Sequence, residues 1–186
     1  MEMMIAGLLL WSAVHFVPSL AQPLKKRWIG AMGESGYKLA FAAMVIVALL
    51  LIIFGWRQAL PTHVYVLPLA VKHLSMLLMV FAFVLFGAAK HPTRIKRYVR
   101  HPQLASVIVW ATAHLLVNGD SRSIVLFGGM AVWATLEMIF INRRYGVWVK
   151  PPAPGWPEEF KGLAISAVML VFVVIGHPYI AGVSIK

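Results

Sequence analysis

Six apolar runs alternate with short polar segments along this chain. The runs cover roughly residues 3–20, 37–55, 64–89, 102–117, 124–141 and 162–180. Each is close to the ~20 residues that cross the hydrocarbon core of a bilayer, although the fourth is short. Because backbone polar groups in lipid must be hydrogen-bonded within the segment, every run predicts a helix. The helix of the first run extends to Lys25 if it continues through Pro23, and otherwise ends near Leu20.

Composition supports a membrane protein. Hydrophobic residues make up 61% of the chain and charged residues only 12%, whereas a soluble domain is about half apolar and a quarter charged. The net charge of +11 lies in short segments between apolar runs, so it indicates topology and lipid headgroup contacts rather than nucleic acid. The chain has no cysteine, which excludes disulfides and thiolate-ligated metals. We therefore predict an all-α integral membrane bundle of about six transmembrane helices in a single domain, residues 1–186.

The basic residues alternate from loop to loop. The first, third and fifth loops carry Lys25, Lys26, Arg27, Lys38, Lys90, Arg94, Lys96, Arg97, Arg100, Arg143, Arg144, Lys150 and Lys161. The opposite side carries Arg57, Lys72, Arg122 and Lys186. By the positive-inside rule the first, third and fifth loops are cytoplasmic, and both termini face the other side of the membrane. No basic residue precedes the first run, so we expect a retained helix rather than a cleaved signal peptide.

Residues 100–120 form the most informative stretch. A cluster of positive charge leads into Pro102 and an apolar run, which stops at Asn118-Gly119-Asp120. These are the start and stop signals of one helix. The run contains His114, and an ionisable residue at membrane depth is a functional candidate by default.

A second histidine, His15, lies in the first run. If Lys25 and Arg100 mark the same membrane surface, His15 is roughly 15 Å deep and His114 roughly 20 Å deep, counted along continuous helices. Two imidazoles at matched depth can bind the iron of a flat macrocycle such as haem b. In the alternative interpretation, each histidine donates a hydrogen bond to a carbonyl on a neighbouring helix and only joins the helices.

The other histidines have weaker signals. His73 and His177 lie near the outer ends of their runs, where each is a candidate ligand, a hydrogen-bonding partner of a ligand, or an interfacial residue; the interfacial interpretation is favoured for each alone. His91 and His101 both precede a proline, and the simplest prediction is a helix-start residue at the headgroups. His63 lies in a loop and has no assigned role.

The acidic residues are few. Glu137 lies inside the fifth run and is predicted to pair with Arg143 and Arg144 at the cytoplasmic end of that helix. Glu158 and Glu159 precede the last run and are expected to cap it. A haem would also need cations for its propionates, and the sequence leaves two sets open: Arg122, Arg57 and Lys72, or Arg100 and Lys25.

Sequence motifs over nearly the full length resemble the NnrU family of small bacterial membrane proteins, which is linked to nitrite and nitric oxide metabolism. The matching segments are GLLLWSAVHFVPSL, GESGYK at 33–38, LAVKHLSMLLM at 69–79, RHPQLASVIVWATAHLLVNGD followed by LFGGMAVWA, and HPYIAGV. That family is similar to zeta-carotene isomerase, a membrane haem b protein that isomerises a cis double bond by redox chemistry at the haem. The resemblance implies haem b in a bacterial inner membrane protein, and it implies His15 and His114 as the iron ligands. The alternation of basic residues adds that both termini are periplasmic.

We therefore expect redox or isomerase-like chemistry, or a role linked to nitric oxide. His73, His177, Arg122 and Arg100 are further candidates for contact with the cofactor. Membrane lipids and a hydrophobic or small gaseous ligand are the expected partners. Whether the protein is an enzyme, and whether it forms a homo-oligomer, stay open.

Two alternatives belong to other classes. Arg100-His101-Pro102 with Glu158-Glu159 resembles the motif that holds S-adenosylmethionine in membrane methyltransferases. The chain departs from that pattern because no glycine follows soon after Pro102, and a plain apolar helix replaces the tyrosine-rich ending. The other alternative is a haemless accessory protein of denitrification, whose intramembrane histidines would be packing or proton-relay groups.

Overall fold

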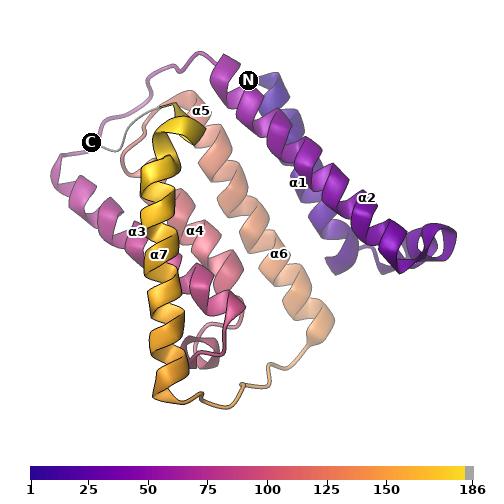
Figure 1. The fold of residues 1–186 in the computed structure, drawn as a ribbon. Helices are drawn as coiled ribbons and strands as arrows, with labels where there is room; N and C mark the ends of the chain where they lie inside the picture. The colour runs from indigo at the N-terminus through magenta and orange to yellow at the C-terminus, as the bar shows by residue number, and fades with distance from the viewer. Residues whose placement is uncertain (183–186) are drawn as a thin grey trace. The chain divides into compact units, whose positions relative to one another are not determined.

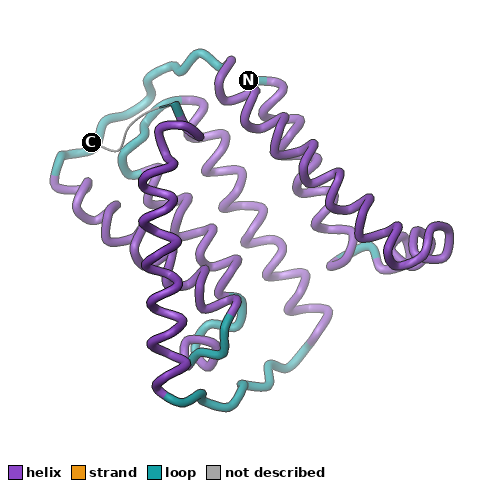
Figure 2. Tube along the Cα trace, in the orientation of Figure 1, coloured by secondary structure: helices purple, strands orange, loops and turns teal. Residues whose placement is uncertain are grey.

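The computed structural model describes residues 1–182, and in them the chain is helical with no β-strand (Figures 1 and 2). In chain order the helices are α1 Glu2–Ser19, α2 Gln22–Gln58, α3 Ala70–Lys90, η1 Arg94–Arg97, α4 Pro102–Leu115, α5 Ser121–Ser123, η2 Ile124–Gly128, α6 Gly129–Tyr145 and α7 Trp156–Ala181. Lys186, which entered the topology prediction, and the final valine of the HPYIAGV segment lie outside the described residues.

Within the described residues, five helices are long and apolar enough to cross a membrane. They are Glu2–Ser19, Gln22–Gln58, Ala70–Lys90, Ser121–Tyr145 and Trp156–Tyr179. The fourth predicted run is the exception, because α4 has only 14 residues and is about 21 Å long, short of the ~30 Å hydrocarbon core. The prediction of an all-α multi-pass membrane protein is confirmed.

The boundaries of the first two helices match the sequence-based prediction only in part. α1 ends at Ser19, and α2 begins at Gln22 with Pro23 in its first turn, where a missing N–H has no cost. The expected first run, residues 3–20, agrees with α1, and its possible continuation through Pro23 to Lys25 does not occur. The predicted start of the second run at residue 37 is wrong, because α2 begins at Gln22. The backbone of α2 is interrupted at Gly33, whose φ of 74° and ψ of 170° are not helical. Because His15 lies on α1 and Lys25 on α2, the depth of His15 cannot be obtained by counting residues from Lys25 along one helix.

The chain divides into two compact units. Unit 1 comprises residues 1–64 and 120–146, with α1, α2, α5, η2 and α6. Its core contains Met4, Leu8 and Ile52. α1 and α2 approach closely at Gly55, where an added Cβ would lie 2.3 Å from the backbone nitrogen of Met4. This contact fixes α1, the helix that carries His15.

Unit 2 comprises residues 65–119 and those from 147 onward, with α3, η1, α4 and α7. The side chain of Ser75 on α3 donates a buried hydrogen bond of 2.7 Å to the carbonyl of Ala113 on α4. α3 and α7 approach closely at Gly87, where an added Cβ would meet the hydroxyl of Ser166. α3 therefore packs against both α4 and α7, and it holds the end of α4 that carries His114.

Candidate functional site

The imidazole of His15 is fixed by its own helix. Its Nδ1 lies 2.8 Å from the carbonyl oxygen of Trp11, one turn earlier on α1. Because a carbonyl only accepts hydrogen bonds, Nδ1 carries a proton. In the neutral ring this bond selects the tautomer whose lone pair is on Nε2, so Nε2 is the candidate nitrogen for binding a metal.

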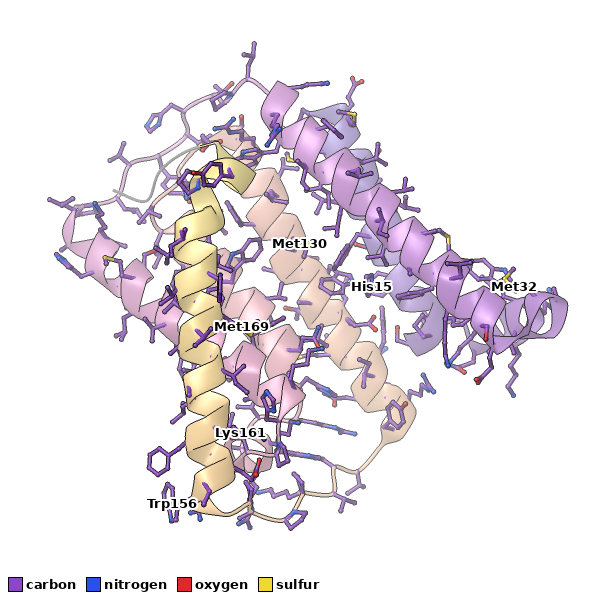
Figure 3. All side chains as sticks on the ribbon, in the orientation of Figure 1. His15, Met32, Met130, Trp156, Lys161 and Met169 are labelled. Carbon is purple, nitrogen blue, oxygen red and sulfur yellow. The ribbon has the colours of Figure 1, made fainter. Side chains whose placement is uncertain are left out.

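Three aromatic rings pack against His15, which is labelled in Figure 3, within unit 1. Ring centroids lie 4.4 Å away for Trp11, 5.1 Å for Trp133 on α6 and 5.4 Å for Phe41 on α2. The indole N–H groups of Trp11 and Trp133 are buried and have no hydrogen-bond acceptor in the part of the chain that the structure describes. Buried donors are almost always paired in folded proteins, so two unmet donors beside one imidazole suggest that a ligand supplies the acceptor.

His114 repeats the geometry of His15. Its Nδ1 lies 2.9 Å from the carbonyl oxygen of Trp110, and the Trp110 ring lies 5.0 Å from the imidazole. Both histidines therefore follow a tryptophan by four residues, and in both the tryptophan carbonyl fixes the tautomer while its ring packs against the imidazole. The repeated Trp-x-x-x-His spacing is visible in the sequence, but the sequence-based prediction pairs the two histidines by their depth in the membrane and does not consider this spacing.

The Nδ1 hydrogen bonds bear on the alternative in which the histidines only join helices. Each bond stays within one helix, α1 for His15 and α4 for His114. These bonds therefore do not join neighbouring helices, and the alternative is wrong for Nδ1 of both residues.

The other histidines are placed differently. His177 on α7 interacts electrostatically with His114, so unit 2 brings these two imidazoles into the same neighbourhood. His73 is exposed in the first turn of α3. His101 precedes α4 as predicted, but His91 follows the end of α3, so its prediction as a helix-start residue is wrong. No helix begins at Pro92; the next helical segment is η1, which begins at Arg94.

Glu137 does not pair with Arg143 or Arg144 among the described residues. The carboxylate is 7% exposed and accepts a hydrogen bond of 2.8 Å from the hydroxyl of Ser19 on α1. Arg144 instead donates to the carbonyl of Pro18. The last carbonyls of a helix have no partner within it, so the end of α1 offers Arg144 an acceptor that the sequence pattern of α6 does not reveal.

The candidate propionate cations lie in different settings. The guanidinium of Arg122 lies 4.3 Å from the ring of Trp56, and its Nε is 3.7 Å from a carboxylate oxygen of Asp120, all within unit 1. Arg100 is partly buried just before α4 in unit 2. Arg122 is therefore held in a fixed orientation by two neighbours.

Glu159 has a structural role that the sequence did not predict. It lies in the first turn of α7, yet its carboxylate accepts hydrogen bonds from the hydroxyl of Thr93, at 2.6 Å, and from the backbone N–H of Arg94, at 2.9 Å. Both Glu158 and Glu159 lie in the first turn of α7, where acids are expected, but neither caps the helix with a side-chain hydrogen bond. Both carboxylate oxygens of Glu159 hold η1 in place, which weakens the methyltransferase alternative because that reading assigns Glu159 to a cofactor.

Five apolar helices of membrane-spanning length among the described residues define a multi-pass helical membrane protein. Its candidate ligand sites are two partly buried histidines, His15 on α1 and His114 on the shorter α4. The family profile described as NnrU protein matches residues 3–185, and the chain belongs to the NnrU family. Comparisons with curated proteins and with solved structures gave no match.

Proposed function

We propose that this NnrU-family protein binds one haem b, with Nε2 of His15 and Nε2 of His114 as the iron ligands. The observation that carries the proposal is the repeated Trp-x-x-x-His geometry. In both copies a backbone carbonyl holds the Nδ1 proton, which is the arrangement that orients metal-binding imidazoles and strengthens their basicity.

The available donors fit haem better than a bare metal ion. Among the described residues no group of three or more His, Asp or Glu side chains is arranged to hold a metal. A haem needs only two imidazoles from the protein, because the porphyrin supplies the other ligands. The unmet indole donors of Trp11 and Trp133 fit as well, since haem b brings two carboxylates as acceptors. Arg122 is a further candidate to neutralise a propionate.

A bound haem would supply one-electron redox chemistry. The protein's own part is to keep both imidazoles neutral and correctly oriented and to exclude water from them with aromatic and apolar side chains. The proposed setting is the bacterial inner membrane with periplasmic termini, in redox or isomerase-like chemistry connected with nitrite and nitric oxide metabolism. Binding of a gas or catalysis at iron would require one histidine to leave.

His177 is the second candidate partner for His114. Its electrostatic interaction with His114 within unit 2 favours it over His73, which is exposed. The two assignments differ in one respect that can be tested, namely whether the second ligand is His15 or His177.

The test is the visible spectrum of protein purified after expression with a haem precursor. We expect a sharp Soret band and resolved α and β bands after reduction with dithionite. A colourless preparation would exclude the haem proposal and favour the haemless accessory role.

Single substitutions then assign the ligands. His15→Ala and His114→Ala should each lose or rearrange the spectrum, whereas His91→Ala at the end of α3 should leave it unchanged. If His15→Ala leaves the spectrum intact and His177→Ala alters it, the second ligand is His177.

A further inference from the structure

Within unit 2, η1 is joined to the N-terminal end of α7 and carries Arg94, whose guanidinium forms no ion pair with the nearby Glu159. Both carboxylate oxygens of Glu159 are used, one by the hydroxyl of Thr93 and one by the backbone N–H of Arg94. Among the described residues the ion pairs are Lys38 with Glu34 and Arg122 with Asp120. Glu159 therefore fixes the backbone of Arg94 without pairing with its guanidinium.

The side chain of Arg94 is nevertheless held in one orientation. Its Cζ lies 4.1 Å from the centroid of the Trp156 ring, and its Nε is buried with no acceptor in the described part of the chain. The Trp156 ring holds the guanidinium in place, and a guanidinium has further N–H groups besides Nε–H that can donate to a planar or tetrahedral oxyanion. A charged donor left without an acceptor is costly, which favours an anionic ligand beside Arg94.

The surrounding charge selects an anionic ligand. Besides Arg94, the segments that flank this end of α7 contribute Lys90, Lys96, Arg100, Lys150 and Lys161, against only Glu158 and Glu159. Figure 3 shows Lys161 beside Trp156 at this end of α7. One of these lysines is occupied, because the ammonium of Lys96 donates to the carbonyl of Ala89 at 3.1 Å. The remaining excess of positive charge favours a phosphate.

Exposed apolar side chains continue from this charged end along α7. Trp156, Phe160 and Leu163 are spaced at i, i+4 and i+7, so they share one face of the helix, and they are 59%, 64% and 42% exposed. The rings of Trp156 and Phe160 lie 6.2 Å apart. A tryptophan with a polar neighbour at a helix end is typical of the headgroup zone of a membrane. A ligand that covers both parts must carry an anionic head and an apolar tail.

We propose that this surface, named here the η1–α7 site and formed by Arg94, Trp156, Phe160 and Leu163, binds an anionic phospholipid. The phosphate accepts hydrogen bonds from the guanidinium of Arg94, and an acyl chain covers the apolar face of α7. Glu159 is a positioning residue, because it sets the backbone of Arg94 through η1. This site is independent of haem and of His15 and His114.

The experiment uses the full-length protein in nanodiscs of phosphatidylcholine, with added phosphatidylglycerol, and measures bound lipid by native mass spectrometry. We expect phosphatidylglycerol to be retained in preference to phosphatidylcholine. Arg94→Gln should weaken phosphatidylglycerol binding about fivefold, the effect of losing one basic contact at an anionic headgroup. The matched control Arg97→Gln removes the same charge from an exposed position of η1 and should leave the affinity within about twofold.

Two additional arms keep the test decisive. Arg94→Lys keeps the charge but loses the planar, multiply donating guanidinium, so it should bind less lipid than wild type and more than Arg94→Gln. Millimolar inorganic phosphate should fail to displace the lipid, because phosphate has no apolar part to cover Trp156 and Phe160. Circular dichroism in phosphatidylcholine verifies that each variant is folded.

Three outcomes would overturn the proposal. They are equal retention of phosphatidylglycerol by wild type and folded Arg94→Gln, an equal loss in Arg94→Gln and Arg97→Gln, and displacement of the lipid by inorganic phosphate. The second outcome would show diffuse electrostatic attraction without a built site, and the third would identify free phosphate as the ligand.

Discussion

Gly55→Ala tests the packing that positions α1 and therefore His15. A Cβ at this position would lie 2.3 Å from the backbone nitrogen and 2.7 Å from the Cα of Met4, whereas ordinary van der Waals contact begins at 3.4 Å. α1 and α2 would have to separate by about 1 Å at this point, because backbone atoms cannot rotate away as a side chain can.

The magnitude follows from two opposing terms. Overpacking costs about 1–3 kcal/mol, and the upper end applies here because the clash is with backbone. Replacing a helical glycine by alanine returns about 1 kcal/mol of helix propensity. We therefore expect Gly55→Ala to lower the free energy of unfolding by about 2 kcal/mol.

The assay is reversible unfolding in mixed micelles with increasing dodecyl sulfate, followed by circular dichroism. Gly30→Ala is the matched control on the same helix, because an added Cβ there meets nothing within 4 Å. It should be neutral or stabilising by up to about 1 kcal/mol. Gly55→Ala with the stability of wild type, or with the stability of Gly30→Ala, would refute the close approach of α1 and α2.

Two further substitutions test contacts that only the structure reveals. Glu137→Leu removes the acceptor of the Ser19 hydroxyl and should cost about 1 kcal/mol in the same unfolding assay, whereas Glu137→Gln keeps an acceptor oxygen and should cost less; a gain of stability in Glu137→Leu would contradict this contact. Gly119→Ala would place a Cβ 1.8 Å from the carbonyl oxygen of Tyr65 and should destabilise unit 2 by about 2–3 kcal/mol, measured by thermal unfolding. Gly128→Ala, with nothing within 4 Å, is its control, and equal melting temperatures would argue against the Tyr65 contact.

Hydropathy predicts most membrane-spanning helices well, but it misses a helical segment that is rich in charged residues. The segment from Gln22 to Met32 contains Lys25, Lys26 and Arg27 and was predicted to be a loop, yet it forms the first part of α2. Lysine and arginine are good helix formers, so polarity there reports contact with water or headgroups and not a change of backbone conformation. The turn at Leu20-Ala21 and the non-helical Gly33 are the actual boundaries of that segment.

Hydropathy and sequence motifs alone identify a helical membrane protein of the NnrU family, and the Trp-x-x-x-His spacing around both His15 and His114 can be seen without a structure. These features depend on local order, since a carbonyl four residues earlier always lies within reach of a helical side chain. Three contacts become visible only in the folded chain: Trp133 packs against His15, Glu137 accepts a hydrogen bond from Ser19, and Glu159 accepts one from the backbone N–H of Arg94. Those contacts join residues far apart in the sequence, and no periodicity along one helix specifies which residue of another helix it will meet.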